Sequence, residues 1–115
     1  ETAKSLGVNY LLAEDIFLMA LEQQKTYIDK FLKNSDGIYL TFCLDVMSEA
    51  IAPGVSAPQA NGLFPQHVWP LLQYILQQKK LLSFDVVECA PNLDHNNQTV
   101  RFASRVVYEM MRGMS

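Results

Sequence analysis

The feature that most constrains this chain is the run Ile38–Leu44 (IYLTFCL), which is apolar almost throughout. It is rich in aromatic and branched side chains, and turn-forming residues precede it. Such a run predicts a strand that is buried on both faces, as in a parallel sheet covered by helices. A second apolar run, Leu81–Val87 (LLSFDVV), predicts another strand. The chain must therefore place helices between and over these strands.

The segments outside the two apolar runs carry helical periodicity. Apolar residues recur three or four positions apart in Glu14–Lys33, in about 65–80 and in about 98–112, which predicts three helices. Pro70 falls inside the second of these stretches. We therefore place the start of that helix near Trp69, so that Pro70 lies in its first turn.

A short apolar run, Val8–Leu12, predicts one more strand ahead of the first helix. The order of elements is then β-α-β-α-β-α. With right-handed crossovers, this order gives parallel strands with helices on the faces, a three-layer αβα arrangement. We expect residues 1–115 to form a portion of one such α/β domain.

Composition excludes several classes of function. Nine basic and twelve acidic residues give a net charge of −3, and no block of Lys and Arg invites nucleic acid. No apolar run approaches the roughly 20 residues that cross a membrane. Cys43 and Cys89 both lie in or beside apolar runs, so we expect two buried thiols in a cytoplasmic protein rather than a disulfide.

Polar residues follow the predicted strands where ligands of open parallel sheets bind, beyond the carboxyl ends. Cys43 and Asp45 close one strand, and Glu88 follows the next. Because residues two apart on a strand point to the same side, Cys43 and Asp45 are expected to reach one site. The carboxylates indicate either a metal or substrate site or solvated strand ends, and the pattern alone leaves both open. The long loop 46–63 between them is a candidate functional loop.

Two motifs resemble those of the ureohydrolase family, which comprises arginases, agmatinases and formimidoylglutamases. Thr41–Asp45 (TFCLD), followed by Ala52–Gly54 and later by Gly62, is similar to its signature Ser-x-Asp-x-Asp, Pro-Gly and Gly. Phe84–Glu88 (FDVVE) with Pro91 resembles its second motif, an Asp-x-x-Glu ahead of a Pro. The loop sequence APGVSAP, which begins at Ala52, looks most like formimidoylglutamase.

The resemblance implies that the chain is the C-terminal portion of a single arginase-like domain, in an enzyme that binds two Mn²⁺ ions and forms a homo-oligomer. Asp45 and Cys43 would be metal ligands, and Glu88 would pair with the cationic nitrogens of the substrate. A hydroxide activated by the two metal ions would hydrolyse a non-peptide C–N bond of a linear amidine. The small-molecule substrate implied is N-formimidoyl-L-glutamate, which yields L-glutamate and formamide in histidine degradation.

The sequence departs from the family pattern at one ligand. Cys43 stands where the family has an Asp, and a thiolate is a softer ligand than Mn²⁺ prefers. Cys43 could ligate a metal as thiolate, it could pack as a neutral thiol, or the site could be degenerate. All three remain open at this point.

The family's His- and Asp-rich motifs are missing. The only histidines, His67 and His95, lie outside any such motif and are expected to be solvated. We therefore expect the rest of a longer polypeptide to supply the other ligands, and this chain alone to show no turnover. The alternatives are an agmatinase or other guanidino hydrolase, and a non-catalytic degenerate α/β module.

Other polar residues have structural explanations. Asp94 is expected to cap or brace the last loop, and Asp85 to bond neighbouring backbone or a loop. Arg101 and Arg105 lie one turn apart on the last predicted helix. They could meet a substrate carboxylate or an adjacent subunit, but a solvated helix face is the simpler interpretation.

Overall fold

A parallel two-stranded sheet lies at the centre of the computed structural model, which describes residues 2–114. Strand β1 (Ile38–Cys43) pairs with β2 (Leu81–Val87), with the register running from Ile38 opposite Leu81 to Cys43 opposite Val87. Both strands predicted from the apolar runs are confirmed, and β2 has the predicted bounds. Because the register is parallel, both strands end at the same edge of the sheet.

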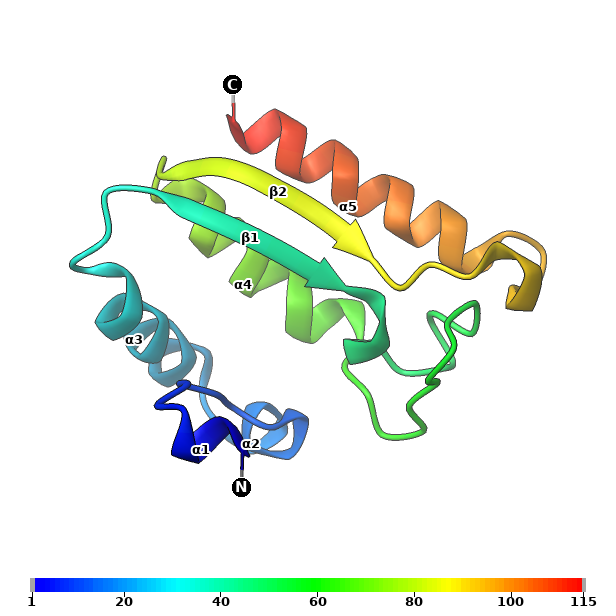
Figure 1. The fold of residues 1–115 in the computed structure, drawn as a ribbon, viewed down its shortest axis with the longest axis horizontal. Coiled ribbons are helices and arrows are strands. Elements are labelled where there is room, and N and C mark those ends of the chain that lie inside the picture. Colours follow the sequence, from blue (N-terminus) through cyan, green and yellow to red (C-terminus); the bar gives the residue numbers. More distant parts are fainter. Residues whose placement is uncertain (1, 115) are drawn as a thin grey trace.

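Three helices pack as a layer on one face of this sheet. Helix α4 (Pro65–Gln77) connects the strands, α5 (Gln98–Met114) packs against β2, and α3 (Leu21–Leu32) packs against α4. Figure 1 shows α4 behind the strands and α5 running alongside β2. The most completely buried side chains lie between the helices and the sheet or in the loop after β1, among them Leu44, Met47, Val55, Val106 and Met110. The α/β class with a parallel sheet is confirmed.

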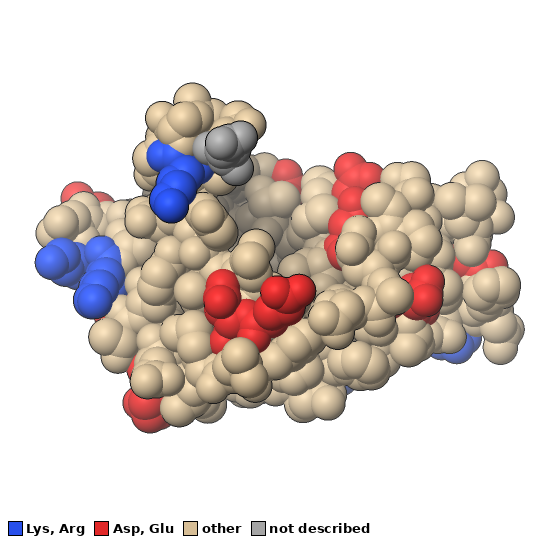
Figure 2. Space-filling view, turned by 90° about the horizontal axis from the view of Figure 1, so that it is seen from below, with Lys and Arg blue, Asp and Glu red and all other residues tan. Residues whose placement is uncertain are grey.

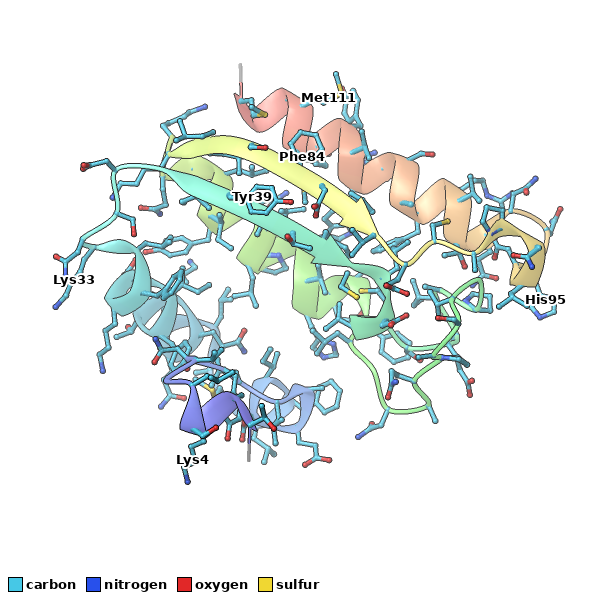
Figure 3. The ribbon with its side chains drawn as sticks, in the orientation of Figure 1. Lys4, Lys33, Tyr39, Phe84, His95 and Met111 are labelled. Atoms are coloured by element: carbon cyan, nitrogen blue, oxygen red, sulfur yellow. The ribbon has the colours of Figure 1, made fainter. Side chains whose placement is uncertain are left out.

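The opposite face of the sheet is open in the described part of the chain. Tyr39 is 63% exposed, and Thr41 and Ser83 are exposed as well. Figure 3 shows Tyr39 in front of the strands, while Phe84 lies between β2 and α5. The expectation that the strand at Ile38–Leu44 is buried on both faces is therefore wrong for residues 2–114, because these residues supply helices to one face only.

The strand predicted at Val8–Leu12 does not form. Among residues 2–114 this segment has no ladder partner, and a strand exists only through such pairing. It follows the short helix α1 (Thr2–Ser5) and runs beside α3, where the Tyr27 hydroxyl donates to the Tyr10 carbonyl at 3.0 Å. In Figure 1 this part of the chain lies well away from the sheet, and in Figure 2 the N-terminal segment stands out from the body of the molecule.

The single helix predicted over Glu14–Lys33 is two helices. Helix α2 (Ala13–Leu18) ends before Met19, and α3 begins at Leu21 after an extended Met19 and Ala20. The buried side chain of Gln24 donates to the carbonyls of Ile16 and Met19, at 3.1 and 3.0 Å. These bonds satisfy carbonyls that the break removes from the helical ladder, and no Gly or Pro marks the break in the sequence.

Helix α4 begins earlier than predicted. Pro65 occupies its first position, and the Nδ1 atom of His67 accepts the backbone N–H of Phe64 at 3.0 Å. Pro70 therefore lies inside the helix, not in its first turn. A proline there leaves the carbonyl of Gln66 without its helical donor. Gln66 is exposed, so water can take the place of that donor.

The last helix agrees closely with its prediction. Helix α5 begins at Gln98, as expected, and continues to Met114. Within residues 2–114, no helix combines the length and the apolar character that crossing a membrane requires.

Candidate functional site

The carboxyl end of β1 carries two of the residues singled out in the sequence. Cys43 is the last residue of the strand and is half-buried. Leu44–Val46 then form a short 3-10 helix, so the alternation of a strand does not set the direction of Asp45. Asp45 is also half-buried, and its Oδ1 atom is buried with no hydrogen-bond partner among the described residues. A buried carboxylate oxygen of this kind is costly unless a donor or a cation satisfies it.

Glu88 follows the carboxyl end of β2 and is exposed. Because Cys43 is opposite Val87 in the register, the backbone of Glu88 begins beside the end of β1. Its φ angle of 70° lies in the left-handed region. A non-glycine residue there costs about 1–2 kcal/mol, and such conformations cluster at functional sites. The structure thus brings Cys43, Asp45 and Glu88 to one edge of the sheet.

The loop after Asp45 is folded back on itself at Gly62. The Ser48 N–H donates to the Leu63 carbonyl at 2.7 Å, and Met47 forms an isolated bridge with Leu63. A Cβ atom at Gly62 would lie 2.5 Å from the Ser48 nitrogen and 2.6 Å from the Met47 oxygen. Backbone atoms cannot yield as a side chain can. The later glycine of the signature is therefore required by close backbone approach.

A second close approach joins the two strand-end loops to the start of α5. The Gly54 N–H donates to Thr99 Oγ1 at 2.8 Å, and the Ala90 N–H donates to the Gly54 carbonyl at 2.7 Å. A Cβ atom at Gly54 would lie 2.8 Å from the Asp94 Cβ. We call Gly54, Ala90, Asp94 and Thr99 the Gly54 junction. It fixes the loop that carries Asp45 relative to the loop that carries Glu88.

Asp94 caps α5 within this junction, as expected from the sequence. Its carboxylate accepts the backbone N–H groups of His95, Thr99 and Val100 at 2.9–3.1 Å. Partial burial by itself would raise the pKa of Asp94. The hydrogen bonds from the Thr99 backbone and hydroxyl, Val100 and His95 outweigh that effect and lower the pKa to about 2. The site loops therefore depend on an ionised carboxylate.

Sequence reasoning missed Thr99 and Gln98, which complete these contacts. Thr99 is fully buried. The Gln98 side chain donates to the Ala50 and Ile51 carbonyls at 2.6 and 3.0 Å. The signal was weak, because their partners lie more than 40 positions earlier and the familiar helix-start patterns concern only neighbouring residues.

Asp85 bonds a side chain on the open face of the sheet rather than the backbone or loop expected. The Tyr39 hydroxyl donates to Asp85 Oδ2, and this bond raises the pKa of Tyr39. Asp85 Oδ1 is buried without a partner among residues 2–114. Asp85 is opposite Thr41 in the register, two residues before the pair formed by Cys43 and Val87. The contact between Tyr39 and Asp85 therefore links β1 to β2 close to the strand ends.

The exposure of Cys89, His67 and His95 agrees only in part with the expectations from the sequence. Cys89 is exposed, so the prediction of two buried thiols is wrong. It lies in the loop beyond the end of β2. His67 is half-buried against Phe17, with ring centroids 5.0 Å apart, and is not a solvated residue. His95 is exposed as expected and lines a hollow of about 370 Å³ with Glu49, Pro53 and Pro58.

The described residues do not assemble a full metal site by themselves. In 2–114 no three or more His, Cys, Asp or Glu side chains come together in a way that could hold a metal ion. Cys43 and Asp45 can contribute two ligands at most, with the orphaned Asp45 oxygen as the feature that fits a cation.

Comparison with known proteins gives a consistent result. A protein-family model described as Arginase family matches residues 1–113 of this chain. A formimidoylglutamase from Legionella pneumophila (strain Lens) is 47% identical over 111 residues, covering 96% of this chain and 35% of the relative. The chain therefore spans about a third of the length of the curated relatives it matches.

Solved structures agree with the sequence relatives. Formimidoylglutamase from Bacillus subtilis subsp. subtilis str. 168 superposes with a TM-score of 0.89 at 27% identity, over 98% of this chain and 36% of that one. Proclavaminate amidino hydrolase from Streptomyces clavuligerus superposes with a TM-score of 0.86 at 25% identity, over 98% and 37%.

Replacing the capping carboxylate tests the Gly54 junction. Because the pKa of Asp94 is lowered from 3.8 to about 2, its ionised form stabilises the fold above about pH 4. That stabilisation disappears as the pH falls through about 2. We expect Asp94→Asn to have a lower Tm than wild type at neutral pH. The difference between the two Tm values should disappear as the pH falls from about 4 to about 2. Asp36→Asn removes an exposed carboxylate elsewhere and controls for net charge; a gap independent of pH would contradict the capping role.

The strain at Glu88 can be measured by comparing two substitutions. Both Glu88→Gly and Glu88→Ala remove the carboxylate, but only glycine adopts φ 70° without steric cost. We expect the glycine variant to be more stable than the alanine variant by roughly 1 kcal/mol in urea unfolding. Equal stabilities would show that the left-handed conformation stores no strain.

Proposed function

The chain belongs to the arginase family, and we propose that it is the C-terminal portion of a metal-dependent hydrolase that cleaves a C–N bond of a linear amidine. The observation that carries the proposal is the meeting of both family motifs at one sheet edge. Cys43, at the end of β1, is opposite Val87, and Glu88 follows at once. The Gly54 junction holds the two loops together beyond that edge.

The residues present fit a share of a two-metal site. Asp45 offers a buried, unsatisfied carboxylate oxygen, and Cys43 offers a half-buried sulfur two residues before it. We propose that these side chains are metal ligands and that the remaining ligands come from the rest of a longer polypeptide. Asp45 and Cys43 would hold part of a pair of divalent ions, Mn²⁺ in our proposal, which when bound would make hydroxide available at neutral pH by lowering the pKa of water.

We propose that Glu88 binds the substrate. An exposed carboxylate, held in a left-handed conformation beside the metal ligands, is suited to pair with the cationic nitrogens of an amidine. The substrate proposed is N-formimidoyl-L-glutamate, with L-glutamate and formamide as products. This choice rests on the relatives named formimidoylglutamase. A guanidino hydrolase is the second candidate, favoured by the likeness to an amidino hydrolase.

A substrate panel tests the proposed activity. The full-length protein that carries this sequence is loaded with Mn²⁺ and assayed with formimidoylglutamate, agmatine and arginine. We expect kcat/KM for formimidoylglutamate to exceed kcat/KM for agmatine and for arginine by at least about a hundredfold. A site built to bind the polar groups of one substrate strongly disfavours an analogue that leaves those binding groups unpaired. Preference for agmatine or arginine would indicate a guanidino hydrolase. No activity and no bound metal would indicate a non-catalytic module.

The role of Cys43 is tested by metal binding itself. With Co²⁺ in the full-length protein, a thiolate ligand produces a near-ultraviolet charge-transfer band, which we expect in wild type and in the Cys89→Ser control. Cys43→Asp should lose the band and shift the relative affinity from Zn²⁺ toward Mn²⁺ by about tenfold or more, because a carboxylate is a harder ligand. Absence of the band from wild type would show that Cys43 packs as a neutral thiol.

A further inference from the structure

A groove runs along the outer surface of the helix layer, between α4 and α5. Two hollows of about 350 and 370 Å³ share Gln73 and Glu109, so they adjoin. Arg105 and Trp69 line one hollow, and Arg112 and Lys79 line the other. We call this surface the α4–α5 groove. In Figure 1 the C-terminal end of α5 lies beside the start of β2, so the hollow lined by Arg112 and Gly113 lies toward the sheet edge opposite the strand ends that carry Cys43, Asp45 and Glu88.

One buried carboxylate organises the cations of this groove. Glu109 is only 6% exposed, and its Oε1 atom accepts from Arg105 Nε at 2.9 Å and pairs with Arg105 Nη2 at 2.7 Å. Its Oε2 atom pairs with Arg112 Nη2 at 3.0 Å. Both guanidinium groups also lie over the Tyr108 ring, at 5.6 and 6.0 Å from its centroid. The two arginines are thus held in place by contacts that engage only part of each guanidinium group.

The arginine heads remain available to solvent. Their side chains are 62% and 65% exposed, and among residues 2–114 the Nη1 atoms of both have no partner. Lys79 adds a third cation at one end, and among residues 2–114 the carboxylate that lines the hollows is that of Glu109. The groove is therefore positive in a chain whose net charge is −3.

The walls of the groove are set by helix packing rather than by mobile loops. A Cβ atom at Gly113 would lie 2.7 Å from Leu76 Cδ2, so glycine lets the end of α5 approach α4 closely. At the other end Trp69 packs on Phe102, with ring centroids 5.6 Å apart. A site between rigid helices loses little entropy when a ligand binds.

We propose that the α4–α5 groove binds a small oxyanion, a phosphate or a carboxylate group, between Arg105 and Arg112. A guanidinium presents paired N–H donors that match the oxygens of either group. The prior alignment of both guanidiniums by Glu109 and Tyr108 lowers the cost of that contact. Anchored in this way, the ligand would bridge the groove and stabilise the packing of α4 on α5.

This site is tested by titrating the full-length protein with inorganic phosphate in low salt and monitoring the amide chemical shifts. We expect saturable shifts confined to α4 and the second half of α5. Arg105→Gln and Arg112→Gln should each weaken binding by about tenfold or more, because each removes charge-assisted hydrogen bonds. Arg101→Gln is the matched control, since Arg101 lies on the same helix, outside the groove, and donates to Asn96; its affinity should equal that of wild type.

A charge-conserving variant and a second anion test the site further. Arg112→Lys keeps the positive charge but removes the paired N–H donors of the guanidinium. This variant should therefore bind phosphate with an affinity between those of Arg112→Gln and wild type. Titration with succinate in place of phosphate identifies the group preferred, and saturation by either supports the site. Shifts that never saturate, or that persist equally in the Arg105→Gln, Arg112→Gln and Arg101→Gln variants, would overturn it.

Discussion

The hydrogen bonds of Gly54 are the constraint on which the arrangement of the strand ends depends. Its N–H donates to Thr99 and its carbonyl accepts from Ala90, so one residue connects the loop after β1, the loop after β2 and the first turn of α5. Only a residue without a side chain fits, because Asp94 fills the space that a Cβ would need. A parallel pair of strands brings its carboxyl ends to one edge, but this junction sets how the two loops face each other there.

Helix α5 serves different purposes at its two ends. Its first turn is anchored by Asp94 and holds the loops of the proposed active site. Its last turns approach α4 through Gly113 and carry the arginines gathered around Glu109. A ligand in the α4–α5 groove would therefore bind the same rigid element that positions the strand-end loops. Rigid helices can transmit such an effect only where they have two discrete arrangements.

Two buried carboxylate oxygens have no hydrogen-bond partner among the described residues. Asp45 Oδ1 lies at the strand ends, and Asp85 Oδ1 lies on the open face of the sheet. Buried oxygens without donors are rare in complete domains. The relatives are about three times as long as this chain. If the chain is a portion of a longer hydrolase, as we propose, the open sheet face and the ligand positions beside Asp45 are where other segments would pack.

Local patterns in the sequence determined much of this protein: the two apolar runs predicted β1 and β2, the 3.6-residue period predicted α4 and α5, and the paired motifs placed Cys43, Asp45 and Glu88 at the strand ends, where the structure has them. Those features depend on neighbouring residues, and so they can be read without a structure. Tertiary contacts decided the rest. Val8–Leu12 forms no strand because it has no neighbour to pair with, and the helix predicted before β1 breaks where Gln24 satisfies the freed carbonyls. The Gly54 junction and the groove between α4 and α5 join residues distant in sequence, and only the folded chain brings them together. The left-handed backbone of Glu88 is likewise seen only in the structure, because no glycine marks that position in the sequence.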